Sequence, residues 1–143
     1  MPGDASIVRA MPSVREHSLT GFARLCGIES VEVLDELVRA RVTVRERHKQ
    51  PAGLVHGGVY ATIAESLAIA GTSLAVGADG RAASGLSTQT SFMRPITGGH
   101  IDALARSRHR GRSTWVWEVE IFDPEGRLCV LSRVTTSVAP SSR

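Results

Sequence analysis

Residues 50–65 read QPAGLVHGGVYATIAE and join a glycine-rich turn to the start of a long helix. Apolar residues then recur at spacings of three and four, which predicts a helix with one apolar face over Val59–Val76. That face consists of Val59, Ile63, Leu67, Ala70 and Leu74. The segment Gly77–Gly80 supplies the glycine signal that ends a helix. Because an apolar helix face must be buried, the elements around this helix determine the fold.

Stretches typical of strands lie on both sides of this helix. Before it, alternating apolar residues predict strands over Gly27–Leu34 and Leu37–Arg45, preceded by a short helical turn over Ser18–Leu25. After it, strands are predicted over Ala82–Met93, Ile101–Arg110, Ser113–Phe122 and Leu128–Val138. No second long helix is predicted, so only a curved antiparallel sheet can cover the apolar helix face. The predicted fold class is therefore α+β, with one sheet wrapped around one helix.

The length and composition fit one domain. The chain has 143 residues, 42% of them hydrophobic, which is enough for one hydrophobic core. Residues 1–17 mix proline, glycine and charged residues without a period, so we expect an arm or frayed terminus there and a single domain over residues 18–140. Cys26 and Cys129 lie far apart without CxxC spacing, which predicts neither a zinc site nor a disulfide scaffold.

The expected location is the cytoplasm. The N-terminal stretch lacks the apolar core of a signal peptide, and no run approaches the roughly 18 apolar residues of a membrane span. We therefore expect no association with a membrane. The formal net charge of +3 suits an anionic small ligand or nucleic acid.

One carboxylate lies inside the predicted helix, about two turns after the glycine-rich turn. Glu65 has apolar neighbours along the chain and shares its helix side with Thr62, Ile69 and Thr72. Such a carboxylate can act as a nucleophile or a general base. The alternative is a glutamate at the edge of the helix, paired with an arginine from a neighbouring strand.

The glycine-rich turn can hold a negatively charged oxygen. A helix N-terminus exposes free backbone N–H groups, and Gly57 and Gly58 let a ligand approach the backbone without a Cβ in the way. The Gly57 N–H can therefore polarise a carbonyl oxygen. His56 can support the loop or polarise the same carbonyl, and Gln50 can bind a water or the reacting group.

Arginines gather at predicted strand ends. Arg94 ends one strand, and a period-two series on another strand predicts one basic face: Arg106, Arg108, Arg110 and Arg112. Guanidinium groups bind phosphates, and Ser113 and Thr114 can hydrogen-bond an extended polar ligand after the turn. The alternative is a solvated face whose arginines pair with acidic residues across the strands, such as Glu118 and Glu120.

Other catalytic chemistries lack their usual sequence patterns. No HxH or HExxH cluster occurs, so no catalytic metal and no cofactor are predicted. No G-x-S-x-G motif occurs either, which leaves a serine nucleophile unsupported.

From about Phe22 to Pro140 the chain resembles the hotdog-fold thioesterases of the 4-hydroxybenzoyl-CoA and phenylacetate-pathway type. The resemblance rests on the segments Gly53–Ser66, Thr90–Pro95 and Gly126–Cys129. It is closest to the branch that carries glutamate, rather than aspartate, on the helix. The resemblance implies a curved sheet around a central helix and hydrolysis of an acyl-CoA, with an aromatic acyl group favoured by the branch alone.

The resemblance also implies roles for individual residues. Glu65 would be the catalytic carboxylate, with Gly57 polarising the thioester carbonyl, Gln50 positioning the reacting group and His56 supporting the loop. Arg94 would lie near the CoA phosphates. Glu65 and Gly57 would come from different subunits of a dimer, and dimers would pair into tetramers.

One position departs from the resembling family. Its members carry serine or threonine four residues after the catalytic glutamate, where a hydroxyl holds the attacking water, but this chain has Ile69. Thr62 is the nearest substitute. Two alternatives to a thioesterase stay open: a hotdog dehydratase, which the glycine-rich turn disfavours, and a non-catalytic module that binds acyl-CoA or nucleic acid. The small number of aromatic residues disfavours nucleic acid.

Overall fold

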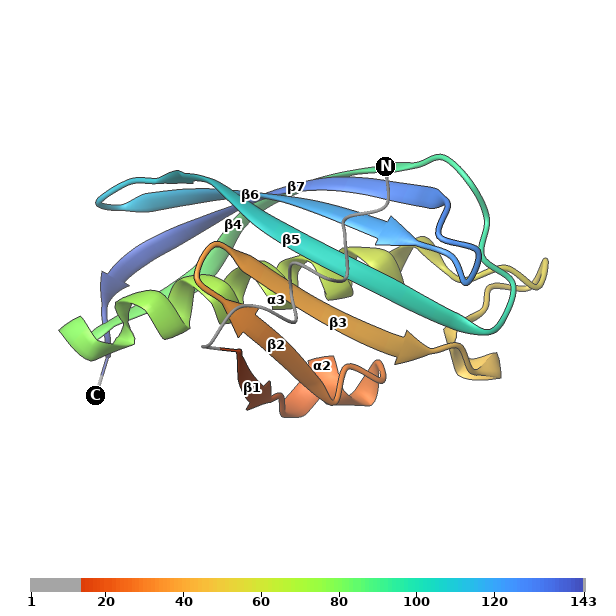
Figure 1. The fold of residues 1–143 in the computed structure, drawn as a ribbon, viewed down its shortest axis with the longest axis horizontal. Coiled ribbons are helices and arrows are strands. Elements are labelled where there is room, and N and C mark those ends of the chain that lie inside the picture. The colour runs from red at the N-terminus through yellow and green to blue at the C-terminus, as the bar shows by residue number, and fades with distance from the viewer. Residues whose placement is uncertain (1–13, 143) are drawn as a thin grey trace.

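The computed structural model describes residues 14–142, so most of the predicted arm lies outside the described residues. Within these residues, seven antiparallel strands form one curved sheet, with the long helix α3 along its inner side (Figure 1). The elements in chain order are β1 (Arg15–Ser18), α2 (Gly21–Leu25), β2 (Ser30–Leu34), β3 (Leu37–Thr43), η1 (Glu46–His48), α3 (Gly57–Val76), η2 (Gly77–Asp79), β4 (Arg81–Phe92), β5 (His100–Arg110), β6 (Thr114–Phe122) and β7 (Leu128–Pro140).

The strand order across the sheet is β1-β2-β3-β5-β6-β7-β4. The α+β architecture agrees with the prediction, and the six strands and both helices that the sequence predicted are present. The extra strand β1 lies where the sequence predicted the end of an arm, because four exposed residues carry no burial signal. β4 forms the other edge of the sheet, although it is twelve residues long.

The core lies between α3 and the inner face of the sheet. Alternation along β6 buries Trp115, Trp117, Val119 and Ile121, as the sequence predicted. The buried helix face is wider than the predicted stripe, because the sheet curves around the helix. It adds Tyr60, Ala64, Ala68, Gly71, Thr72 and Val76, whereas Val59 and Leu74 are only partly buried.

A buried polar network fixes how α3 crosses the sheet. The Trp117 indole N–H donates to the Thr72 hydroxyl over 2.9 Å, and the Thr136 hydroxyl lies 3.0 Å from the same oxygen. Gly71 lies directly under Trp117, and a Cβ on Gly71 would stand 2.5 Å from the indole ring. The helix therefore packs closely against β6 and β7 at this point.

The apolar character of α3 follows from this burial. By length and composition alone, Gly57–Asp79 is apolar enough to cross a membrane, although polar residues such as Thr62, Glu65 and Thr72 interrupt its apolar sequence. Half of its most apolar window is buried inside the fold. Its composition is thus that of a core helix packed on a sheet.

Candidate active site

The glycine-rich turn forms the N-terminus of α3. His56 is the N-cap, and its Nδ1 accepts a hydrogen bond of 2.8 Å from the Gly58 N–H. The Gly57 N–H has no acceptor within the described residues, so it is free at the positive end of the helix. A Cβ on Gly57 would stand 2.8 Å from the Phe92 ring, so glycine is required for this close packing.

Glu65 points away from the core. Its side chain is exposed and takes part in no ion pair or hydrogen bond among the described residues. This rules out, for the described part of the chain, the alternative in which an arginine from a neighbouring strand neutralises it. One carboxylate oxygen lies against the Cα of Gly85 on β4. The carboxylate is therefore chemically available beside the edge strand.

Gly57 and Glu65 do not form one compact site within a single chain. Eight helical residues correspond to about 12 Å along the helix axis. A thioester carbonyl that accepted a hydrogen bond from Gly57 would thus lie far from the carboxylate of the same chain. The two groups can meet on one thioester only if they come from different subunits.

The remaining predicted residues around the turn make local contacts. The Gln50 side-chain oxygen accepts a hydrogen bond from the Ala52 N–H within its own loop. The Thr62 hydroxyl donates to the Gly58 carbonyl over 2.8 Å, which leaves its oxygen free to accept. Ile69 is half-buried, whereas Thr72, predicted on the same helix side, lies in the core.

His48 supports the glycine-rich turn, although no sequence pattern predicts this role. Its Nδ1 accepts from the Arg45 N–H over 2.8 Å, so Nε2 carries the proton and donates to the Cys26 carbonyl over 2.9 Å. The His48 carbonyl accepts from the His56 N–H over 2.8 Å. A histidine in a polar loop shows no periodicity, so only the fold identifies its role.

The prediction of one basic face on β5 is wrong. A bulge between Ser107 and His109 shifts the register with β6. Arg106 lies opposite Glu118 on the outer face, whereas Arg110 lies opposite the buried Trp115 on the inner face. The period of two breaks because the bulge inserts one residue.

Two of these arginines are engaged within the chain. Arg108 donates to Glu118 over 2.7 Å, as in the solvated-face alternative. The Arg110 guanidinium lies 4.6 Å from the centre of the Trp115 ring and donates to the Asp35 carbonyl over 2.7 Å. Arg110 therefore holds the β5–β6 hairpin against the β2–β3 turn.

The predicted phosphate-binding residues lie near opposite ends of β4. Arg112 and Ser113 lie in the β5–β6 turn, and Thr114 begins β6. The Arg112 carbonyl accepts a hydrogen bond of 3.4 Å from Arg81, at the start of β4. Arg94 follows the far end of the same strand, roughly 40 Å away along twelve extended residues. One chain does not bring Arg94 and Arg112 together.

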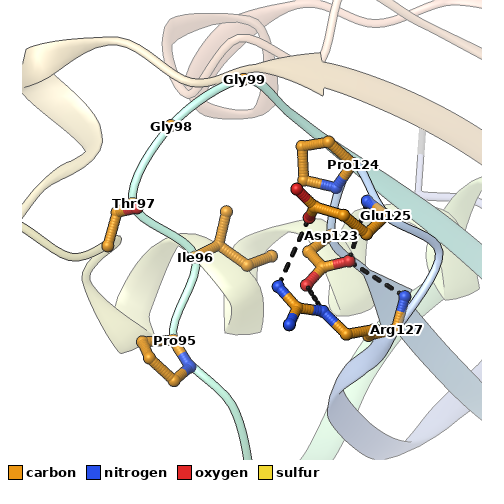
Figure 2. A pocket seen from close by; sticks show the side chains of 9 residues that line it. All are labelled: Pro95, Ile96, Thr97, Gly98, Gly99, Asp123, Pro124, Glu125 and Arg127. Atoms are coloured by element: carbon orange, nitrogen blue, oxygen red, sulfur yellow. Dashed lines mark hydrogen bonds and ion pairs between the residues drawn. The ribbon is translucent and has the colours of Figure 1, made fainter.

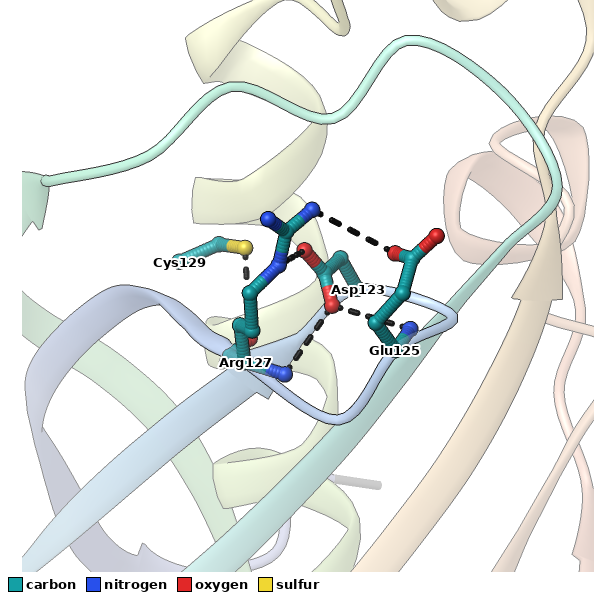
Figure 3. A network of polar contacts seen from close by, with 4 residues as sticks. All are labelled: Asp123, Glu125, Arg127 and Cys129. Carbon is teal, nitrogen blue, oxygen red and sulfur yellow. Dashed lines mark hydrogen bonds and ion pairs between the residues drawn. The ribbon is translucent and has the colours of Figure 1, made fainter.

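A cavity of about 360 Å³ lies elsewhere, between the loop at residues 95–99 and the turn at 123–127 (Figure 2). Its buried carboxylate, Asp123, accepts from the Arg127 guanidinium over 2.7 Å and from the N–H groups of Glu125 and Arg127 (Figure 3). Burial alone would raise the pKa of Asp123, but these donors outweigh it and lower the pKa. The charged groups satisfy one another here and close the β6–β7 turn.

Within residues 14–142, no group of three or more histidine, cysteine, aspartate or glutamate side chains is placed to hold a metal ion.

The Tyr60 hydroxyl is buried on α3, close to the glycine-rich turn, and has no hydrogen-bond partner among the described residues. Burial raises its pKa to about 12, and the nearby Ile96 backbone offsets part of this rise. Its ring packs on Phe92, with the centroids 6.0 Å apart.

Comparison with known proteins identifies relatives across most of the chain. Residues 52–130 match the family model described as the thioesterase superfamily. The 1,4-dihydroxy-2-naphthoyl-CoA hydrolase of Escherichia coli K12 is 31% identical, over 92% of this chain and 93% of its own. The proofreading thioesterase EntH of Cronobacter turicensis is 36% identical, over 78% of this chain and 81% of its own.

The solved structures agree with these relatives. A mutant of thioesterase PA1618 from Pseudomonas aeruginosa superposes with a TM-score of 0.80 and 32% identity, covering 85% of this chain and 88% of its own. The resemblance and the hotdog fold predicted from the sequence are thereby confirmed.

Proposed function

Because the chain belongs to the thioesterase superfamily and is a thioester hydrolase, we propose that it hydrolyses acyl-CoA thioesters to a free acid and CoA. The observation that carries this proposal is the presence of two chemically available groups, a carboxylate and a backbone N–H, on the helix α3. Within residues 14–142, Glu65 presents a carboxylate without an ion pair, and Gly57 presents an N–H without an acceptor at the positive end of α3. A non-catalytic binding module would have no use for this combination.

Each group has a defined task in the proposed reaction. The thioester carbonyl oxygen accepts a hydrogen bond from the Gly57 N–H, and the helix dipole stabilises the negative charge that develops there. Glu65 either attacks the carbonyl carbon or removes a proton from the attacking water. Gln50 positions the reacting group, Thr62 can accept a hydrogen bond from the water, and His56 holds the turn through Gly58.

The proposed site is shared between two subunits that meet along β4. Among the described residues this edge strand pairs only with β7, and large apolar side chains are exposed on it and just after it, with Leu86 59%, Phe92 59% and Met93 53% exposed. Antiparallel pairing of two copies through β4 would bring Glu65 of one subunit toward Gly57 of the other. The separation of about 12 Å within one chain supports this arrangement. Pairing of dimers into a tetramer stays a prediction.

CoA binding is assigned to exposed basic and polar groups. Arg94, Arg112, Ser113 and Thr114 are proposed to contact the phosphates, with Gly58 and Ile69 near the reacting end. Arg110 would join them only by leaving Trp115 and Asp35. A dimer can bring Arg94 of one subunit toward the β5–β6 turn of the other, which one chain cannot do.

An aromatic acyl group is the proposed preference. The relative named 1,4-dihydroxy-2-naphthoyl-CoA hydrolase acts on an aromatic acyl-CoA by its name. The exposed Phe92 ring beside Gly57 offers a surface on which an aromatic acyl group can stack. The proposed reaction uses water alone and no cofactor, and a cytoplasmic location stays a prediction.

The test is a release assay for the CoA thiol on a panel of aromatic and aliphatic acyl-CoA thioesters. We expect turnover with at least one of them and the highest kcat/KM on an aromatic member. Tight binding of the panel without release of CoA would contradict the proposed function. Turnover confined to aliphatic members would contradict the acyl preference only.

A further inference from the structure

Gly85 occupies an unusual position in β4. Glycine in a strand interior weakens the strand and often marks a close approach by another group. Here the approaching group is the carboxylate of Glu65. A carboxylate oxygen of Glu65 fills the space in which a Cβ of residue 85 would stand, with the Glu65 carboxylate carbon 3.0 Å and its Cγ 3.4 Å from that position.

The strand also changes its course at this residue. A register shift between Gly85 and Ser87 leaves Leu86 without a partner on β7. Such bulges bend a strand and re-aim its residues, and they are frequent next to active sites. The missing side chain and the bulge both lie where Glu65 meets the sheet.

We propose that Gly85 is a positioning residue for thioester hydrolysis, because the Glu65 carboxylate lies in the space that a side chain at residue 85 would fill. This inference rests on the proposed function of Glu65. No hydrogen bond or ion pair among the described residues holds that carboxylate. Its orientation is therefore set by its own helix and by the flat backbone surface at Gly85.

The substitution Gly85→Ala should separate catalysis from folding. The added methyl group would meet the far end of a flexible, exposed side chain, so the carboxylate can swing away while the strand stays in place. A misplacement of about 1 Å in a catalytic geometry can cost about 10²-fold in rate. We expect kcat to fall by about that factor while KM stays within about threefold, since CoA is bound elsewhere.

Gly77→Ala is the matched control. Gly77 has an ordinary helical φ of −63°, and nothing lies within 4 Å of the added Cβ. This variant should keep the wild-type kcat and KM. Thermal unfolding and sedimentation of both variants would show whether the fold and assembly are unchanged.

The sharpest readout is the dependence on side-chain length at residue 65. Asp is one methylene shorter than Glu, so in the Glu65→Asp background the carboxylate no longer reaches residue 85. In the Glu65→Asp variant, adding Gly85→Ala should therefore change kcat by less than about twofold. The effects of the two substitutions on kcat would then not be additive, because Gly85→Ala alone lowers the wild-type kcat much more.

Several outcomes would overturn the inference. Wild-type kcat in Gly85→Ala would do so, as would an equal loss of kcat in the Glu65 and Glu65→Asp backgrounds. So would a folding defect in Gly85→Ala that Glu65→Ala does not repair, because the conflict would then lie with the strand itself. If Glu65→Gln keeps full activity, the proposed function of Glu65 fails instead.

Discussion

Ile69 lies one helical turn after Glu65, where the resembling family has a hydroxyl. It is half-buried and does not pack against the core cluster. A polar side chain can therefore replace it without opening a core cavity. On the preceding helical turn, the Thr62 hydroxyl donates to the Gly58 carbonyl and can still accept a hydrogen bond from an attacking water.

The substitution Ile69→Thr should leave the melting temperature nearly unchanged and keep or raise kcat on aromatic acyl-CoA thioesters. The physical reason is that the new hydroxyl can hold the water that Glu65 activates. Thermal unfolding and steady-state kinetics on the same variant test this. Unchanged stability with a sharply reduced kcat would mean that Ile69 shapes the acyl pocket directly.

At the scale of residues, the sequence identifies groups that act through their own chemistry. Glu65 and Gly57 could be recognised because a carboxylate two helical turns after a glycine-rich helix N-terminus is a local pattern that indicates catalytic chemistry. Gly85, His48 and Phe92 could not, because their roles depend on contacts with distant segments. No periodicity in the sequence records which residue lies opposite Glu65.

At the scale of elements, the contact of α3 with β6 depends on close packing at Gly71. The added Cβ of Gly71→Ala would stand 2.5 Å from the Trp117 ring and 2.8 Å from Val38. Both neighbours are fully buried, so neither can move aside without cost. We expect a loss of about 1–3 kcal/mol in the free energy of unfolding, measured by denaturant or thermal unfolding. A variant as stable as Gly77→Ala would contradict this packing.

The β6–β7 turn should make stability depend on acid. The folded pKa of Asp123 is lowered, so its ionised form stabilises the fold above the unfolded pKa, and this contribution disappears as pH falls through the folded pKa. Wild-type stability should therefore drop below about pH 4. Asp123→Asn should be less stable at pH 7 and lose less on acidification.

Thermal unfolding at pH 7 and pH 3 measures this difference. Asp35→Asn is the control, because the exposed Asp35 side chain makes no ion pair among the described residues. Equal acid sensitivity in Asp123→Asn and the wild type would contradict the role of this turn.

The elements themselves could be predicted because helix and strand periods are local properties of the sequence. Boundaries agreed within a few residues for α3 and the strands β3 to β7. The bulge in β5 could not be predicted, since Arg106, Arg108, Arg110 and Arg112 keep a period of two through it. The register between β5 and β6 depends on contacts between the two strands, and it places Arg110 opposite Trp115.

For the molecule as a whole, the proposed shared site requires an oligomer. The exposed apolar edge at β4 and the distance between Gly57 and Glu65 both call for a second copy. Sedimentation at micromolar concentration should show a dimer or a larger assembly, and specific activity should fall on dilution as subunits separate. A monomer that keeps full activity would contradict the shared site.

The decisive measurement for the proposed role of the Glu65 carboxylate in hydrolysis is kcat of Glu65→Gln on the best acyl-CoA substrate. Because Glu65 is exposed and makes no ion pair among the described residues, the Glu65→Gln variant should have the wild-type melting temperature. The control variant Glu29→Gln, at another exposed glutamate, should also have it. We predict a fall in kcat of about 10²–10⁴-fold for Glu65→Gln alone. A near-wild-type kcat in the folded Glu65→Gln variant would contradict it.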